Sequence, residues 1–305
     1  MVSVARAQAP TQAGVLIPVK PADLLMLAIF SACAICAMWG RSGAWEVASA
    51  TFIALAVAPI VVRAAAHHWH SLTLDLFGDF CLPVVGVIVS YGHLDPVADL
   101  FHVPLADARL QSIDAALFGG QPSVMLAPHI GPLASNILMS CYSSYYLWPF
   151  LLGVLLMIYR GRDAFDRWSL TILAGIFLNY AFYMAVPAIG PRLALAGDFA
   201  APVQGFLAGP LFRDFLHSPY QRDCFPSGHT AAALLVLFHA WRHLRPYFWA
   251  VLLPCLGLVV ATIALRFHYG IDLIAAVPFS AMVYLLSEKL YAALPRGIAI
   301  LSNAS

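Results

Sequence analysis

The chain alternates long apolar segments with short polar connections. A helix of about 20 mostly apolar residues crosses the hydrocarbon core of a bilayer, and candidate segments of this kind are centred near residues 31, 54, 84, 146, 178, 235, 256 and 281. The third segment contains Asp75, Asp79 and Pro83, so it is either a span or a helix at the membrane interface. The pattern predicts an all-α, polytopic membrane helix bundle of about eight spans.

The composition agrees with a membrane protein. Hydrophobic residues make up 62% of the 305 residues and charged residues only 10%, whereas an ordinary soluble domain has about 25% charged residues. The net charge of +1 comes from scattered cations, and nucleic-acid binding needs a clustered basic surface. We therefore expect the bilayer as a partner and no nucleic acid.

The basic residues predict how the bundle is oriented. Short cytoplasmic loops are enriched in Lys and Arg. An eight-span arrangement puts most of the basic residues on one side, namely Lys20, Arg63, Arg160, Arg162, Arg167, Arg242, Arg245, Lys289 and Arg296. That side is expected to be the cytoplasm and to hold both termini, since the N-terminus lacks the pattern of a signal peptide.

The same pattern divides the chain into five parts. Residues 1–23 and 293–305 are expected to be cytoplasmic tails, 24–92 N-terminal spans and 133–292 a catalytic membrane core. Residues 93–132 are expected to form an extracytoplasmic cap with an amphipathic helix around residues 105–118. The cap either shapes an entrance for a lipid headgroup or connects two spans along the lipid surface.

Two segments expected on the extracytoplasmic side carry the candidate chemistry. Asp272 follows His268 by four residues, so a helix that begins near His268 places both on one face, where the carboxylate orients the imidazole. In the stretch CFPSGHT, Ser227 and Gly228 form a turn that feeds a helix, and exposed N–H groups at such a turn bind anions. His229 then stands beside the anion, placed to give or take a proton.

Arginine side chains supply possible phosphate ligands. Arg192 and Arg266 offer fork-shaped donors suited to phosphate oxygens. Their alternative role is to reach from the bundle toward lipid headgroups. Four further loop residues are interpreted as a solvated ion-pair surface: Arg213, Asp214, Arg222 and Asp223. No set of residues with the spacing of metal ligands is predicted.

These residues resemble a known family. FPSGHT and RFHYGID are similar to the second and third motifs of the type 2 phosphatidic acid phosphatase family, whose fold is shared by vanadium-dependent haloperoxidases. AVPAIGPR, YGID and IDAALFGGQPS resemble the branch that contains inositol phosphorylceramide synthase of the aureobasidin-resistance type. The resemblance covers roughly residues 105–278 and implies a six-helix phosphatase-type core.

The resemblance implies a role for each matching residue. His268 would be the nucleophile that forms a phosphohistidine, Asp272 its orienting carboxylate and His229 the general acid. Ser227 and Gly228 would form the oxyanion-binding turn, with Arg192 and Arg266 as further phosphate ligands. The substrate would be a phospholipid or lipid phosphate, with water or an alcohol or polyol as acceptor, and no cofactor would be required. A bacterial inner membrane is the expected location, with the site facing the periplasm.

The sequence departs from the family pattern at two positions. Ala185 stands where the first motif has a lysine, and Thr262 where the third has an arginine. Arg266 lies only two residues before His268, which weakens its match to the third-motif arginine. Two further classes of function stay open: a non-catalytic protein that binds or transports lipids, and a vanadate-using oxidase.

Overall fold

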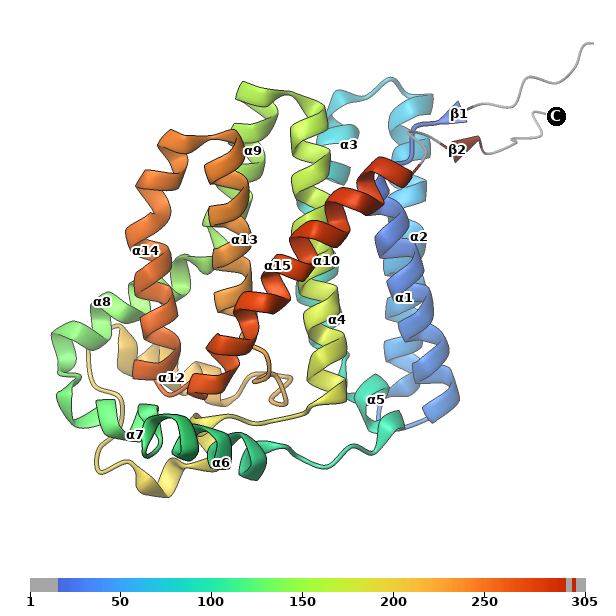
Figure 1. Ribbon diagram of the computed structural model, residues 1–305. Helices are drawn as coiled ribbons and strands as arrows, with labels where there is room; N and C mark the ends of the chain where they lie inside the picture. Colours follow the sequence, from blue (N-terminus) through green and yellow to red (C-terminus); the bar gives the residue numbers. More distant parts are fainter. Residues whose placement is uncertain (1–15, 295–297, 300–305) are drawn as a thin grey trace, which may run out of the picture.

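The structure is a computed structural model that describes residues 16–294 and 298–299. Most residues of the two expected tails, 1–23 and 293–305, lie outside this described part of the chain. Two short strands, β1 (Leu16–Ile17) and β2 (Ile298–Ala299), pair antiparallel, and the other regular elements are helices. The ends of the described chain thus lie side by side (Figure 1).

Long apolar helices form the bundle, which confirms the prediction of an all-α multi-pass membrane protein. Six helical segments are long and apolar enough to cross a membrane: α1 (Pro21–Gly40), α2 (Trp45–His68), the continuous helix Leu72–Tyr91, α10 (Arg162–Ala185), α14 (Arg245–Ala264) and α15 (Gly270–Ala293). A seventh span results if the bent pair Pro132–Tyr146 and Trp148–Arg160 is counted as one.

Three of the eight candidate segments differ from a single regular α-helix of membrane length. The segment near residue 84 is one helical run made of α3 (Leu72–Leu76), the π-helical η1 (Phe77–Cys81) and α4 (Leu82–Tyr91), so it is long enough to cross. The segment near residue 235 is α13 (Gly228–His243), which has only 16 residues. The segment near residue 146 is the bent pair, in which α8 (Pro132–Ser143) and η4 (Ser144–Tyr146) meet α9 (Trp148–Arg160) at 46°.

Helix α10 connects the two halves of the bundle. It packs against α1 and α4 on one side and against α9, α13 and α15 on the other (Figure 1). Phe177 of α10 meets Phe30 of α1 edge to face, with ring centroids 5.1 Å apart. Large apolar side chains such as Trp39 and Leu253 point outward and are 80% and 77% exposed, as expected for surfaces that face lipid.

The polar connections gather at one end of the bundle. Five short elements follow α4: α5 (Asp95–Ala98), η2 (Asp99–Phe101), α6 (Asp107–Phe118), α7 (Pro122–Leu126) and η3 (Ala127–His129). They run beneath the helix ends in Figure 1. Helix α6 lies where an amphipathic helix was expected, at 105–118, but its buried residues are Asp107, Leu110 and Asp114, so it has no apolar buried face. The same end holds α11 (Pro191–Ala194), η5 (Ala196–Asp198) and α12 (Ala208–Leu216).

The opposite end holds a charged cluster that spans four helical segments. Its members are Lys20, Asp23, Arg63, Asp75, Asp79 and Arg162. Arg63 is 2% exposed, and its guanidinium lies 2.8 Å from both Asp23 and Asp79. Asp79 also pairs with Lys20 and Arg162. The carboxylates that weakened the third candidate span are therefore paired within the protein.

Loss of Arg63 is expected to destabilise the bundle. An Arg63→Met variant leaves buried carboxylates without their central cation, and breaking a buried pair in this way costs about 3–5 kcal/mol. Thermal unfolding of the purified protein in detergent measures the loss as a lower Tm. Arg109→Met, at an exposed position of α6, is the matched control and should unfold close to the wild type; equal Tm values for all three proteins would contradict a stabilising role for the cluster.

Candidate active site

The stretch around Ser227 forms the N-terminus of α13. The Ser227 hydroxyl accepts the N–H of Thr230 at 3.3 Å, as an N-cap residue does. Ser227 is fully buried and its own N–H donates to the carbonyl of Asp272. The side chain of Ser227 thus stabilises the helix start, while the next two residues, Gly228 and His229, line a cavity.

Gly228 is required by the close approach of α10. A Cβ at this position would meet the amide oxygen of Asn179 and would lie 2.6 Å from the Tyr183 hydroxyl oxygen. Asn179 also donates to the carbonyl of Pro226 at 3.0 Å. The glycine therefore allows two polar side chains of α10 to reach the turn, in addition to keeping the backbone open to an anion.

The His268 ring is held by the backbone that precedes the PSGH turn. Its Nδ1 lies 2.8 Å from the carbonyl oxygen of Cys224 and 3.3 Å from Oδ2 of Asp272. A carbonyl oxygen only accepts hydrogen bonds, so Nδ1 carries the proton. The lone pair of the neutral ring is then on Nε2, which is the arrangement that a nucleophile needs.

Asp272 reaches His268 although the helix starts later than expected. The sequence suggested a helix beginning near His268, but α15 begins at Gly270 with Tyr269 as its N-cap. Asp272 is the third residue of the helix, and its Oδ2 accepts the Tyr269 N–H at 2.8 Å and the Cys224 thiol at 2.9 Å. The capping geometry, rather than a shared helical face, brings the carboxylate to the histidine.

Arg192 lies at the same site and is paired. The turn at Gly190, with φ +76°, leads into α11, and a Cβ at Gly190 would meet the Phe267 carbonyl at 2.7 Å. Nη2 of Arg192 donates to Oδ1 of Asp223 at 2.7 Å, and Oδ2 of Asp223 accepts the Tyr91 hydroxyl at 2.7 Å. Among the described residues, Nε of Arg192 is buried without a partner, so it is a donor left for a ligand.

The pair is ionised. Burial alone would raise the pKa of Asp223, but the Arg192 guanidinium and the Tyr91 hydroxyl outweigh it and hold the pKa below its ordinary value. Burial likewise acts to lower the pKa of Arg192, and the Asp223 carboxylate more than compensates, so that pKa is raised. Asp223, interpreted from the sequence as part of a solvated surface, is instead a residue of the site.

Arg266 lies away from this cavity. Its Nη2 donates to the Ala201 carbonyl at 2.8 Å, and its guanidinium covers the Phe199 ring at 4.0 Å. It lines a different cavity, together with residues 198–204. The structure therefore brings Arg192, Gly228, His229, His268 and Asp272 together, and places Arg266 outside this group.

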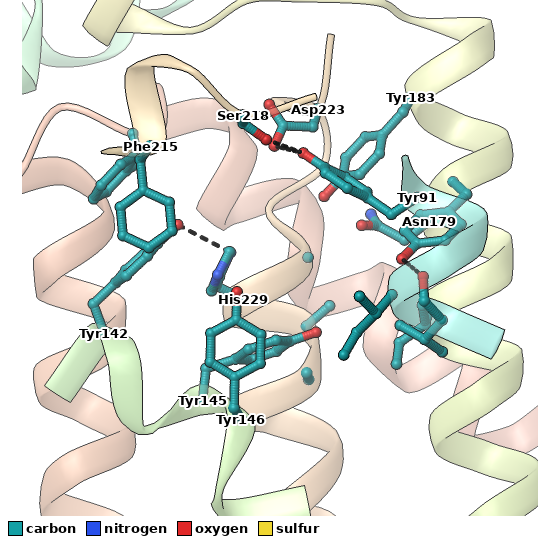
Figure 2. Close-up of a pocket in the computed structure, with 18 of the residues that line it drawn as sticks. Tyr91, Tyr142, Tyr145, Tyr146, Asn179, Tyr183, Phe215, Ser218, Asp223 and His229 are labelled. Atoms are coloured by element: carbon teal, nitrogen blue, oxygen red, sulfur yellow. Dashed lines mark hydrogen bonds between the residues drawn. The ribbon is translucent and has the colours of Figure 1, made fainter. Parts of the chain in front are cut away.

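The cavity itself has a volume of about 470 Å³ and is surrounded by aromatic rings. Six tyrosines line it: Tyr91, Tyr142, Tyr145, Tyr146, Tyr180 and Tyr183. His229 lies between rings of Tyr142 and Tyr145, with centroids 4.3 and 4.5 Å away, and Tyr91, Tyr183 and Asn179 face it across the cavity (Figure 2). The centroids of the His229 and His268 rings are 6.2 Å apart; His268 itself is buried, 3% exposed, behind the cavity wall.

Two aspartates of α6 hold the loops of the site. Asp107 accepts the N–H groups of Ile189 and Gly190, each at 3.0 Å, next to Arg192. Asp114 accepts the N–H groups of Gly270 and Ile271 at 2.7 and 2.8 Å, next to His268. No described residue of 93–132 lines the cavity, so the cap neither forms a headgroup entrance there nor serves only as a connector.

One buried group has the composition of a metal site. Ligand atoms of Cys224, His268 and Asp272 lie within 4.8 Å of one another. The same atoms already satisfy each other by hydrogen bonds, and burial followed by the Asp272 carboxylate raises the pKa of the Cys224 thiol well above its usual value. Since a metal binds the thiolate, we interpret the group as a hydrogen-bonded assembly around His268.

Comparison with known proteins places the chain in a family. A sequence model described as the PAP2 superfamily matches residues 109–286, more than half of the chain. The chain belongs to the PAP2 superfamily. A PA-phosphatase related-family protein of Dictyostelium discoideum is 24% identical over 172 residues, which are 49% of this chain and 31% of the relative. The chain thus spans about a third of that relative's length, and no solved structure matches it.

Several residues of the site were not predicted from the sequence. Tyr91, Asn179 and the Cys224 carbonyl belong to it, as do the supporting carboxylates Asp107 and Asp114. Asp114 alone carried a usable signal, since it falls in IDAALFGGQPS, a stretch that resembles the family. The sequence contained no signal for Tyr91 and Asn179, because both residues lie in apolar segments far from the motifs.

Asp114 is expected to act as a positioning residue. Asp114→Ala removes the acceptor of two N–H groups beside His268, so we expect a fall in kcat of about 10- to 100-fold with a smaller change in KM. Phosphate release from a lipid phosphate measures both constants. Asp114→Asn keeps one acceptor oxygen and should recover part of kcat. The control Ser112→Ala, at an exposed position of α6, should leave kcat unchanged. A normal kcat for Asp114→Ala would refute the positioning role of Asp114.

Proposed function

We propose that this PAP2 superfamily protein is a membrane enzyme that moves the phosphoryl group of a lipid phosphate through a phosphohistidine on His268. The observation that carries the proposal is the hydrogen bond from Nδ1 of His268 to the Cys224 carbonyl, because it leaves Nε2 with a lone pair beside His229. A protein that only bound lipid would not need an oriented nucleophile next to a second titratable ring.

The first half-reaction forms the covalent intermediate. Burial lowers the pKa of His229 to about 3, and the negative charge of the bound lipid phosphate raises it again, so that His229 takes up a proton with the substrate. Nε2 of His268 attacks phosphorus, the bond from phosphorus to the lipid oxygen breaks, and His229 gives this proton to the departing alkoxide. Arg192 and the N–H groups at the start of α13 balance the charge on the phosphoryl oxygens. Asp272 stabilises the positive charge that the His268 ring gains on attack.

The second half-reaction decides between hydrolysis and transfer. His229, now neutral, takes a proton from the acceptor as its oxygen attacks phosphorus, and the bond from phosphorus to Nε2 breaks. Water as acceptor yields inorganic phosphate. In the transferase alternative, to which the motifs resembling the inositol phosphorylceramide synthase branch point, His268 carries an inositol phosphate and the acceptor is a hydroxyl of a ceramide or diacylglycerol-type lipid.

Substitution of the two histidines tests the assigned roles. His268→Ala should lower turnover by at least about 1,000-fold, since the covalent route is lost. His229→Ala should be nearly as severe with lipid phosphates but milder with a nitrophenyl phosphate, whose leaving group departs without a proton. The folded state of each variant is checked by its Tm, and His102→Ala, an exposed histidine, is the control. Equal losses for His229→Ala on both substrates would contradict the general-acid role.

Product analysis identifies the acceptor. Purified protein is incubated with phosphatidic acid, lysophosphatidic acid or phosphatidylinositol, with and without glycerol, inositol and ceramide, and the products are identified by mass spectrometry. Phosphate release indicates hydrolysis, and a new phosphodiester indicates transfer. Binding of these lipids with no product under any condition would support the non-catalytic alternative.

We further propose that the site faces the outside of the cytoplasmic membrane. The charged cluster lies at the end of the bundle opposite the site, as the positive-inside bias requires for a cytoplasmic end. In a Cys81→Ala background, a cysteine that replaces Phe206 should react with a membrane-impermeant thiol reagent in intact cells. Phe206 is 86% exposed and lies just before α12, at the same end of the bundle as the site. A cysteine at Arg245, exposed at the other end, should react only after lysis; the reverse pattern would place the site in the cytoplasm.

A further inference from the structure

A second cavity adjoins the candidate active site. It has a volume of about 160 Å³ and lies between the helical run Leu72–Tyr91, the bent pair and α10. The two cavities share six lining residues, namely Val87, Ile88, Tyr145, Tyr146, Ile172 and Ile176. The two cavities, here together called the groove, lie one after the other from His229 into the apolar part of the bundle, with the shared residues at their junction.

The groove changes from polar to apolar along its length. Arg192, Asp223 and His229 lie at the reactive end. Beyond the shared residues the lining is apolar or aromatic apart from Ser169 and Asp79, and it includes Pro83, Val84 and Gly153. Such a gradient matches a lipid phosphate, which has a charged group at one end and hydrocarbon at the other.

The groove is long enough for one hydrocarbon chain. On α10 its lining extends from Tyr183 to Phe165, which corresponds to about 27 Å of helix at about 1.5 Å per residue. One leaflet contributes about 15 Å, half of the hydrocarbon core. A chain whose phosphate lies at His229 can therefore stay within the groove for the full depth of its leaflet.

The far end of the groove is closed by packed rings. The Phe80 ring lies 4.8 Å from Phe165 and 5.6 Å from Phe150, measured between centroids. Next to Phe80, Asp79 is fixed by its partners in the charged cluster, including Arg63 and Arg162 at 2.8 Å. The residues at this end of the groove are therefore continuous with the charged cluster around Arg63.

We propose that the groove holds one hydrocarbon chain of the lipid substrate, and that the closed end limits the length of chain that binds productively. The inference rests on the proposed function, because it takes the phosphate to bind at Arg192 and His229. The bilayer is as apolar as the groove, so the groove adds little affinity. It acts by placing the phosphorus atom next to His268 when the chain fits.

A chain-length series tests the groove. Val84 is 45% exposed and lines only the deeper cavity, so Val84→Trp should block the groove without disturbing the core. We compare kcat/KM for dioctanoyl, didecanoyl, dilauroyl and dipalmitoyl phosphatidic acid in mixed micelles. A misfit of one methylene in an apolar pocket lowers specificity by about tenfold or more, so Val84→Trp should lose about tenfold or more on dipalmitoyl substrate and little on dioctanoyl substrate.

The control separates blockage of the groove from added bulk. Leu253→Trp places the same side chain on the outer face of α14, 77% exposed and outside the groove, and should keep the wild-type chain-length profile. The same profile in Val84→Trp as in the wild type would overturn the proposal. No turnover of any lipid phosphate by the wild type would instead refute the proposed function.

A second measurement does not depend on turnover. A lipid phosphate with a diazirine at the end of one chain is photolysed with the wild-type protein, and the labelled peptides are mapped by mass spectrometry. We expect label on the segments that form the deep end, around Phe80, Phe150 and Phe165, and its loss in Val84→Trp. Label spread evenly over lipid-facing surfaces such as Leu253 would refute the groove even if the enzyme is active.

Discussion

The site depends on two carboxylates that accept four backbone N–H groups. Asp107 and Asp114 lie two turns apart on α6, and each holds a different loop of the site, one before Arg192 and the other after His268. These loops belong to segments about eighty residues apart, and irregular backbone at a membrane surface needs partners for its polar groups. By supplying those partners, α6 fixes both loops to one surface, and with them the distance between Arg192 and His268.

The sequence was sufficient to predict the fold class and to single out three polar residues that the structure brings together, because both depend on local signals. Apolar runs of membrane length predicted the helices, and PSGH with H-x-x-x-D predicted His229, His268 and Asp272. A helix around residues 105–118 was also predicted, but its buried carboxylates and their function were not, since nothing local to Asp107 or Asp114 shows which N–H groups they will meet.

The remaining differences arise from contacts between distant segments. From the sequence, Asp223 was interpreted as a charged loop residue on the surface. In the structure it accepts hydrogen bonds from Arg192 and Tyr91. From the sequence, Arg266 was expected to be a phosphate ligand. In the structure its guanidinium contacts Phe199 and Ala201 instead. Even the His268–Asp272 contact, predicted from spacing, is made by a helix cap whose position depends on where α15 begins.

The Arg192–Asp223 pair also bears on how substrate arrives. Because the guanidinium already has a counterion 2.7 Å away, the pair has almost no net charge when viewed from a distance. Charged surfaces speed association by attracting ligands over about a Debye length, and a neutral pair lacks that attraction. An anion dissolved in water is therefore not drawn toward the site, whereas an anion on a lipid needs only to diffuse within the membrane plane until it meets the side of the bundle.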